Sequence, residues 1–100
     1  MNQVRDAECV YIYGAGVIGR AINKYLKKCD INVTAFLVTS CDEKKMTVDG
    51  LPVFQFDKAR LGMNDLVVIA VKEMYYRQVE EILLQGGIIQ YTKYDDICGK

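Results

Sequence analysis

Three glycines at a regular spacing are the residues of this chain best suited to chemistry. Gly14, Gly16 and Gly19 follow the apolar run Cys9–Tyr13 and form a G-x-G-x-x-G pattern that continues as a helical repeat. In such a unit the first glycine permits a tight turn, the second lets the backbone approach a phosphate, and the third lets the helix pack closely on the strand. The first N–H groups of the helix and the positive end of its dipole favour negative charge. The spacing therefore predicts a site for an anionic ligand, of which a nucleotide diphosphate is the natural example.

The glycines have no catalytic constellation beside them. The chain contains no histidine, no serine or cysteine in a nucleophile motif, and no Tyr-x-x-x-Lys spacing of the short-chain reductase type. Its four cysteines have no C-x-x-C spacing, so we expect no metal site. Thiols at apolar positions behave as small hydrophobes, and reduced cysteines indicate a cytoplasmic protein. We therefore expect a chain that binds a ligand without catalysing a reaction by itself.

Alternating apolar runs and helical repeats must position the glycines. Apolar, β-branched runs are typical of strands covered on both faces, and apolar residues at helical spacing follow two of them. The repeat from Ile18 to Cys29 includes Ala21 and Tyr25, which we expect on its buried side. The connector 39–50 shows no helix, and 57–61 fits one helical turn. In chain order the pattern predicts a strand at 9–13, a helix at 18–29, strands at 31–38, 51–54 and 66–71, a helix at 74–85 and a strand at 88–91.

This order of elements predicts one α/β domain over residues 1–100. Right-handed crossovers give a small Rossmann-like, three-layer domain with few helices and a parallel sheet of about five strands in the order 3-2-1-4-5. Pro52 puts the third strand at an edge, after a turn at Asp49-Gly50. The ligand belongs outside the carboxyl ends of the first and fourth strands, where the winding reverses. The residues expected to line it are Gly14, Ala15, Gly16, Val17, Ile18, Gly19, Thr39, Ser40, Ala70, Val71, Lys72, Tyr75 and Arg77.

Two groups of these residues have distinct expected roles. Thr39 and Ser40 stand about twenty residues after the glycines, where a NAD site places an acid that reads the ribose, and their hydroxyls can bond a ribose or a phosphate less selectively. On the other side of the crevice, Lys72 or Arg77 can neutralise a diphosphate, and Tyr75 can stack on a base or sugar. The alternative for these three is an ordinary exposed position at the start of a helix.

Charge and hydropathy limit the partners. Thirteen basic and thirteen acidic residues leave no net charge, which argues against a nucleic acid or an anionic membrane surface, since both need a clustered positive excess. No apolar run approaches the ~20 residues that span a bilayer. One face of the predicted sheet is thinly covered. We therefore expect that face to meet a catalytic domain or a second subunit, with a homo-oligomer such as a dimer as the simplest form.

Three segments resemble a recurring small domain. They are 11–20 with the glycine turn, 48–53 with the sequence Val-Asp-Gly-Leu-Pro-Val, and 67–71 followed by Arg77. Together they look like the N-terminal Rossmann-like domain of bacterial sugar N-acetyltransferases of the bacillosamine type. They are also similar to the corresponding region of nucleotide-sugar dehydratases of polysaccharide biosynthesis. The resemblance implies that Gly14 to Gly19 face the diphosphate of a nucleotide-sugar, that Arg77 lies in the crevice, and that another domain carries out the acyl transfer.

These observations lead to one expected function and two alternatives. We expect a non-catalytic module that binds a nucleotide or a nucleotide-sugar such as a UDP-sugar. It would work beside an enzyme that modifies surface polysaccharides, either as part of a longer chain or alone. The first alternative is a NAD(P)-binding fragment of an oxidoreductase or redox sensor. The second is a Rossmann-shaped oligomerisation domain whose crevice holds no ligand.

Overall fold

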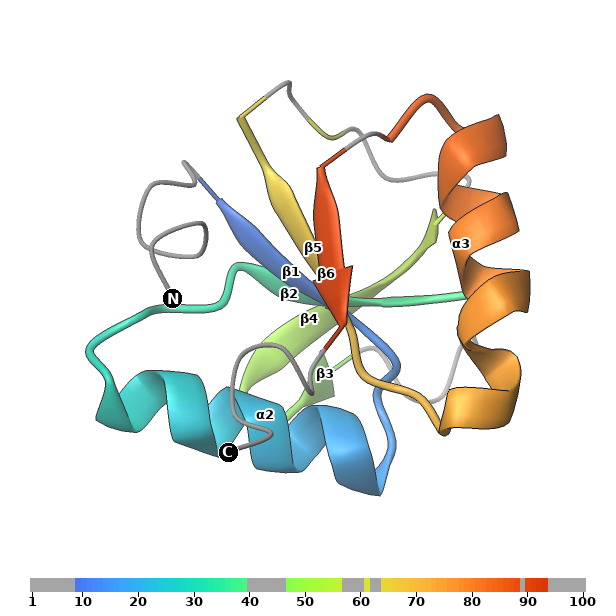
Figure 1. Cartoon of the computed structure of the whole chain (residues 1–100). Helices are drawn as coiled ribbons and strands as arrows, with labels where there is room; N and C mark the ends of the chain where they lie inside the picture. The colour runs from blue at the N-terminus through green and yellow to red at the C-terminus, as the bar shows by residue number, and fades with distance from the viewer. Residues whose placement is uncertain (1–8, 40–46, 57–60, 62–63, 89, 94–100) are drawn as a thin grey trace.

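The computed structural model describes residues 9–39, 47–56, 61, 64–88 and 90–93, and its centre is a six-stranded sheet (Figure 1). Its strands run in the order β3-β4-β2-β1-β5-β6. They are β1 (Val10–Tyr13), β2 (Ala35–Val38), β3 (Thr47–Val48), β4 (Leu51–Gln55), β5 (Leu66–Ile69) and β6 (Tyr91–Lys93). The helices are α2 (Val17–Lys28) and α3 (Tyr76–Gln85), the latter preceded by the 3-10 turn η2 (Glu73–Tyr75). The chain is therefore a small α/β domain.

The sheet is mixed, which corrects the prediction of about five parallel strands in the order 3-2-1-4-5. Five strands run parallel, side by side as β4-β2-β1-β5-β6, but the two-residue strand β3 is added antiparallel to the outer edge of β4. A two-residue turn joins β3 to β4, with φ at 51° for Asp49 and 81° for Gly50. Positive φ at both central residues is the type I′ geometry, whose twist matches that of the flanking strands. Asp49-Gly50 therefore makes a β-hairpin, whereas the sequence predicts only a turn there.

The two central strands are buried along their whole length. Every residue of β1 and β5 is buried, and their registers pair Tyr11 with Val67 and Tyr13 with Ile69. A strand between two parallel neighbours with cover on both faces has no exposed side, which is why neither run contains a charged residue and all the residues of both are aliphatic or tyrosine. The reversal of winding thus lies between β1 and β5, because β2 continues the sheet on one side of β1 and β5 on the other.

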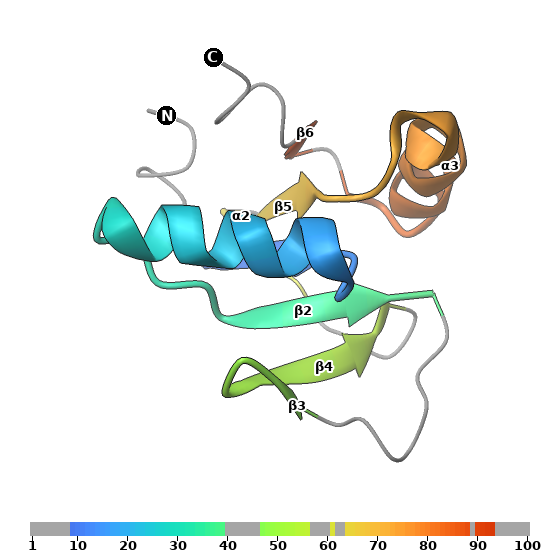
Figure 2. The ribbon, with the colours of Figure 1, turned by 90° about the horizontal axis from the view of Figure 1, so that it is seen from below.

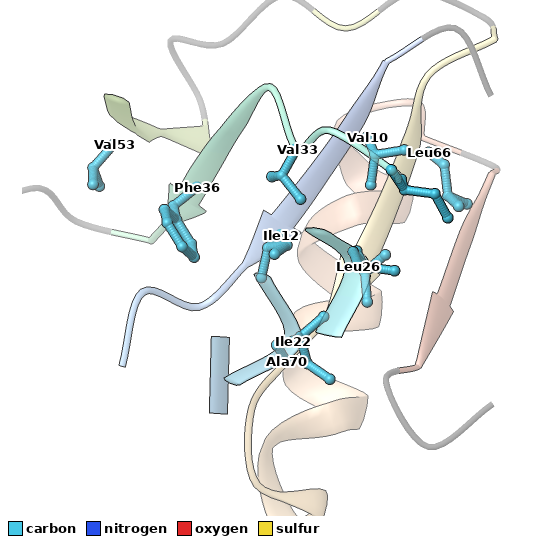
Figure 3. Close-up of a cluster of buried hydrophobic side chains, with 11 residues drawn as sticks. Val10, Ile12, Ile22, Leu26, Val33, Phe36, Val53, Leu66 and Ala70 are labelled. Atoms are coloured by element: carbon cyan, nitrogen blue, oxygen red, sulfur yellow. The ribbon is translucent and has the colours of Figure 1, made fainter. Parts of the chain in front are cut away.

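The two helices pack against opposite faces of the sheet (Figures 1 and 2). On one face, Ile22 and Leu26 of α2 pack with Ile12 and Phe36 of the sheet, as Figure 3 shows. On the opposite face of the sheet, the buried residues of α3 pack against side chains of β1, β2 and β5. Along each of these strands, the side chains that face α3 alternate with those that face α2. This second cluster contains Tyr11, Tyr13, Ala35, Leu37, Val67, Ile69, Tyr76, Val79 and Leu83.

Several element boundaries differ from the sequence-based prediction. The second strand begins at Ala35 rather than at residue 31, and the last covers Tyr91–Lys93 rather than 88–91. Helix α2 buries a narrower stripe than expected, since Ala21 and Tyr25 are exposed while Gly19 is buried. Most of the helical turn expected at 57–61 and most of the 39–50 connector lie outside the described residues.

Candidate functional site

Backbone hydrogen bonds fix the glycine turn to the strands on both sides of β1. The amide of Gly14 donates to the carbonyl oxygen of Leu37 on β2 at 2.8 Å, and the amide of Ala70, just after β5, donates to the carbonyl of Tyr13 at 3.0 Å. The turn therefore begins at the carboxyl edge of the parallel strands, between β2 and β5. Ligands of open α/β sheets bind at such an edge, where the winding reverses.

Packing within the chain explains the first and third glycines. Gly14 has φ at 118°, a backbone angle that residues with a side chain rarely adopt. A Cβ atom there would also lie 2.6 Å from the carbonyl oxygen of Ala70. A Cβ atom on Gly19 would overlap the carbonyl oxygen of Gly14, because α2 passes directly against the turn. Both glycines are thus required by the turn and by helix packing, whether or not a ligand binds.

Packing does not explain the second glycine. A Cβ atom on Gly16 would meet nothing within 4 Å among the described residues, and its backbone, with φ at −88° and ψ at −154°, lies in the extended region open to any residue. Gly16 is also the N-cap of α2, so no N-cap side chain accepts a hydrogen bond from the first amides of the helix. The first turn of α2 has no acidic residue either. The first N–H groups of a helix have no acceptor within it. An open space thus lies beside donors that suit an anion.

The remaining predicted residues fall into a buried and an exposed group. Ala70 is buried and Val71 is half-buried, and both contact the position where a Cβ of Gly14 would lie, so they form the wall of the turn. Lys72, Tyr75 and Arg77 are exposed around the start of α3. Within the described part of the chain none of their side chains has a hydrogen bond or ion pair, although the Tyr75 amide donates to the Lys72 carbonyl oxygen at 2.8 Å. The exposed side chain of Val17 and the half-buried Ala15 and Ile18 complete the predicted set around the turn, whereas Ser40 lies outside the described residues.

A hydrogen bond that sequence reasoning missed connects the ends of β1 and β2. The hydroxyl oxygen of Tyr13 lies 2.6 Å from Oγ1 of Thr39. Tyr13 is only 3% exposed, and its ring lies 6.0 Å from that of Phe56 between centroids. The sequence does show a tyrosine directly before the first glycine. Its partner Thr39 could not be predicted, because their hydrogen bond depends on the parallel register of β1 and β2.

A shallow pocket lies away from the glycine turn. It has a volume of about 100 Å³ and lies between α2, the segment before β2 and the β3–β4 hairpin, lined by Asn23, Lys27, Ile31, Asn32, Val33, Asp49 and Leu51. Nearby, Nε of Arg20 lies 3.3 Å from a carboxylate oxygen of Asp49 and ties the hairpin to α2. None of the predicted binding residues lines this pocket.

Two tyrosines outside the turn have a raised pKa. Burial, and then the hydrogen bond that its hydroxyl donates to Glu80 at 3.1 Å, raise the pKa of Tyr91 above 10.0. Burial, and then the charge of Asp65, raise that of Tyr11. Because folding favours the protonated phenols, this stabilisation is complete below pH 10 and is lost as pH rises through the higher folded pKa values.

We therefore expect urea unfolding to show a lower free energy of unfolding at pH 11 than at pH 9. Tyr91→Phe removes the share of this loss that comes from Tyr91, because phenylalanine has no proton to lose. Absorbance titration of the folded chain, which contains seven tyrosines, should show one fewer group titrating above pH 10 in the variant. An unchanged pH dependence in Tyr91→Phe would contradict the raised pKa.

Comparisons with known proteins provide no identification. No protein-family model, curated protein or solved structure matches the chain. Among the described residues there is no group of three or more His, Cys, Asp or Glu side chains that could hold a metal ion. Within the same ranges, neither helix has the length and apolar character needed to cross a membrane. The glycine turn is therefore the feature that supports a binding site.

Proposed function

We propose that the chain is a Rossmann-like module that binds the diphosphate of a nucleotide at Gly14 to Gly19. The observation that supports this most directly is Gly16, which neither packing nor backbone geometry requires and which leaves space beside the first amides of α2. A phosphate in that space would accept hydrogen bonds from these amides and lie at the positive end of the helix dipole. In this proposal Lys72 and Arg77, which are exposed around the start of α3, add positive charge.

The ligand class that we propose is a nucleotide-sugar, such as a UDP-sugar, or a dinucleotide of the NAD(P) type. Tyr75, which is 49% exposed at the start of α3, supplies an aromatic surface for a base or sugar. We propose that the module acts beside a catalytic domain or subunit that modifies sugars of surface polysaccharides, and that the chain forms a homo-oligomer. The resemblance to the sugar N-acetyltransferases and nucleotide-sugar dehydratases motivates this choice of partner.

Replacing Gly16 with serine tests the site without disturbing the fold. Serine is a favoured N-cap, so its hydroxyl can accept from a first-turn amide and leave the melting temperature unchanged or slightly raised. The same hydroxyl would occupy the open space and engage the donors that the phosphate needs. We expect thermal shift and calorimetry to show stabilisation of the wild type by UDP-sugars, UDP, NAD or NADP at millimolar concentration. Gly16→Ser should bind that ligand at least about tenfold more weakly, given the net value of a charged hydrogen bond.

The matched control is Ala21→Ser, which adds the same hydroxyl to an exposed position of α2 five residues further along the chain. It should leave ligand affinity unchanged. A wild-type chain that no nucleotide stabilises would rule out the proposed function, and equal affinity in Gly16→Ser and wild type would place any binding elsewhere. The identity of the best ligand then separates a UDP-sugar module from a NAD(P) module.

A further inference from the structure

The pairing of Tyr13 with Thr39 places two hydroxyls at the carboxyl edge that carries the glycine turn. Tyr13 is the last residue of β1 and directly precedes Gly14, while Thr39 directly follows β2. The amide of Gly14 also donates to β2, at Leu37, so the turn and the end of β2 are joined by a backbone bond as well as by this side-chain bond. Any ligand that extends from Gly16 along the edge towards β2 would meet Thr39.

Either hydroxyl of the pair could be the donor, and their surroundings and acidity favour Tyr13. Tyr13 is buried and its ring packs beside Phe56, whereas Thr39 is exposed. A phenol is a stronger acid than an alcohol and is the better donor of the two. In the favoured direction Tyr13 donates, the Thr39 oxygen is held in place by the bond that it accepts, and the Thr39 proton is available to a further acceptor. An accepted bond also polarises a hydroxyl and strengthens its donation to a further acceptor.

We propose that Thr39 Oγ1 donates a hydrogen bond to an acceptor oxygen of the bound ligand, and that Tyr13 is the positioning residue that holds this hydroxyl. The proposal rests on the proposed nucleotide site and deepens it. A carboxylate at this place would accept from a ribose diol and repel a phosphate. A hydroxyl donor instead suits either a ribose oxygen or a phosphate oxygen, because both of these ligand atoms accept hydrogen bonds.

Thr39→Val tests this donor, because it keeps the branched shape and removes only the hydroxyl. The probes are UDP and ADP, their 2′,3′-dideoxy forms and inorganic pyrophosphate, each measured by calorimetry. We expect Thr39→Val to bind the ribonucleotide about three- to tenfold more weakly than wild type, the range of one net hydrogen bond. Thr39→Ser keeps the hydroxyl and should restore most of the affinity. Loss confined to the ribonucleotides identifies a ribose oxygen as the acceptor, and an equal loss for pyrophosphate identifies a phosphate oxygen.

Tyr13→Phe tests the positioning role. It keeps the buried ring beside Phe56 and releases the Thr39 hydroxyl, so affinity should fall less than in Thr39→Val, and adding Tyr13→Phe to Thr39→Val should cost no further affinity. A merely structural role of Tyr13 would make Tyr13→Phe weaken binding as much in the Thr39→Val background as in the wild type, which contradicts the proposal. If the wild type binds the probes and Thr39→Val binds them equally well, the Thr39 inference fails alone. If the wild type binds none of them, the proposed function fails and the inference fails with it.

Discussion

Gly19→Ala is expected to lower the free energy of unfolding by more than about 3 kcal/mol, near the upper end of what one substitution costs. The added Cβ would overlap the carbonyl oxygen of Gly14 and come within 3.4 Å of the Ile12 side chain. The overlapped atom belongs to a backbone that is fixed by the bond from the Gly14 amide to Leu37, so it cannot move away as a flexible side chain would. To relieve the overlap, α2 must shift away from β1 and lose part of its packing. Urea unfolding followed by circular dichroism measures the loss.

Gly16→Ala is the matched control, since it makes the same change three residues earlier in the same turn. Its Cβ would enter open space, and the expected cost is the modest preference of N-cap positions for glycine over alanine, below about 1 kcal/mol. A large difference between the two variants supports the close approach of α2 to the turn. If Gly19→Ala is as stable as Gly16→Ala, the helix does not contact the turn as described.

The sequence was informative where local pattern and tertiary environment agree. β1 and β5 were predictable because strands buried on both faces contain no charged residue, and each run is made of aliphatic residues and, in β1, tyrosines. The glycine spacing located the turn between β1 and α2, and the structure shows the physical need for Gly14 and Gly19 that the pattern implied. The end of α3 at Gln85 was also predictable, because two glycines follow it and helices commonly end before a glycine with positive φ. Gly87 has this conformation, with φ at 83°.

The sequence was less informative where pairing across the sheet decides the outcome. The two-residue strand β3 is too short to produce a pattern of its own and exists because Asp49-Gly50 folds it back on β4. The bond between Tyr13 and Thr39 joins residues 26 positions apart and requires the register of β1 with β2. The start of β2 at Ala35 was missed for a related reason. The residues before it are partly apolar and buried, but the amide of Ile31 bonds back to Leu26 of α2, and bonding to β1 begins only at Thr34.

Phe36→Ala is expected to cost about 3–5 kcal/mol of unfolding free energy, the range for emptying a buried phenylalanine site. Phe36 lies on β2 between β1 and β4, is 0% exposed, and is among the largest fully buried side chains of the described residues. It packs in the cluster under α2 with Ile12 and Val53, which come from the two neighbouring strands (Figure 3). These neighbours are held in the sheet by ladder hydrogen bonds and cannot collapse into the space that the ring leaves. The loss therefore includes a cavity as well as the lost burial of the ring.

Phe54→Ala provides the comparison, because it makes the same change on the adjacent strand. Phe54 lies opposite Leu37 in the register of β2 with β4 and is 45% exposed. Its removal leaves no closed cavity, so we expect a cost below about 1.5 kcal/mol, from lost partial burial and strand propensity. Urea unfolding of both variants measures the difference, and similar costs would contradict the burial of Phe36. Small domains are stable by about 5–15 kcal/mol, so Phe54→Ala should remain folded. Phe36→Ala should be close to half unfolded in water only if the wild-type stability lies at the lower end of that range.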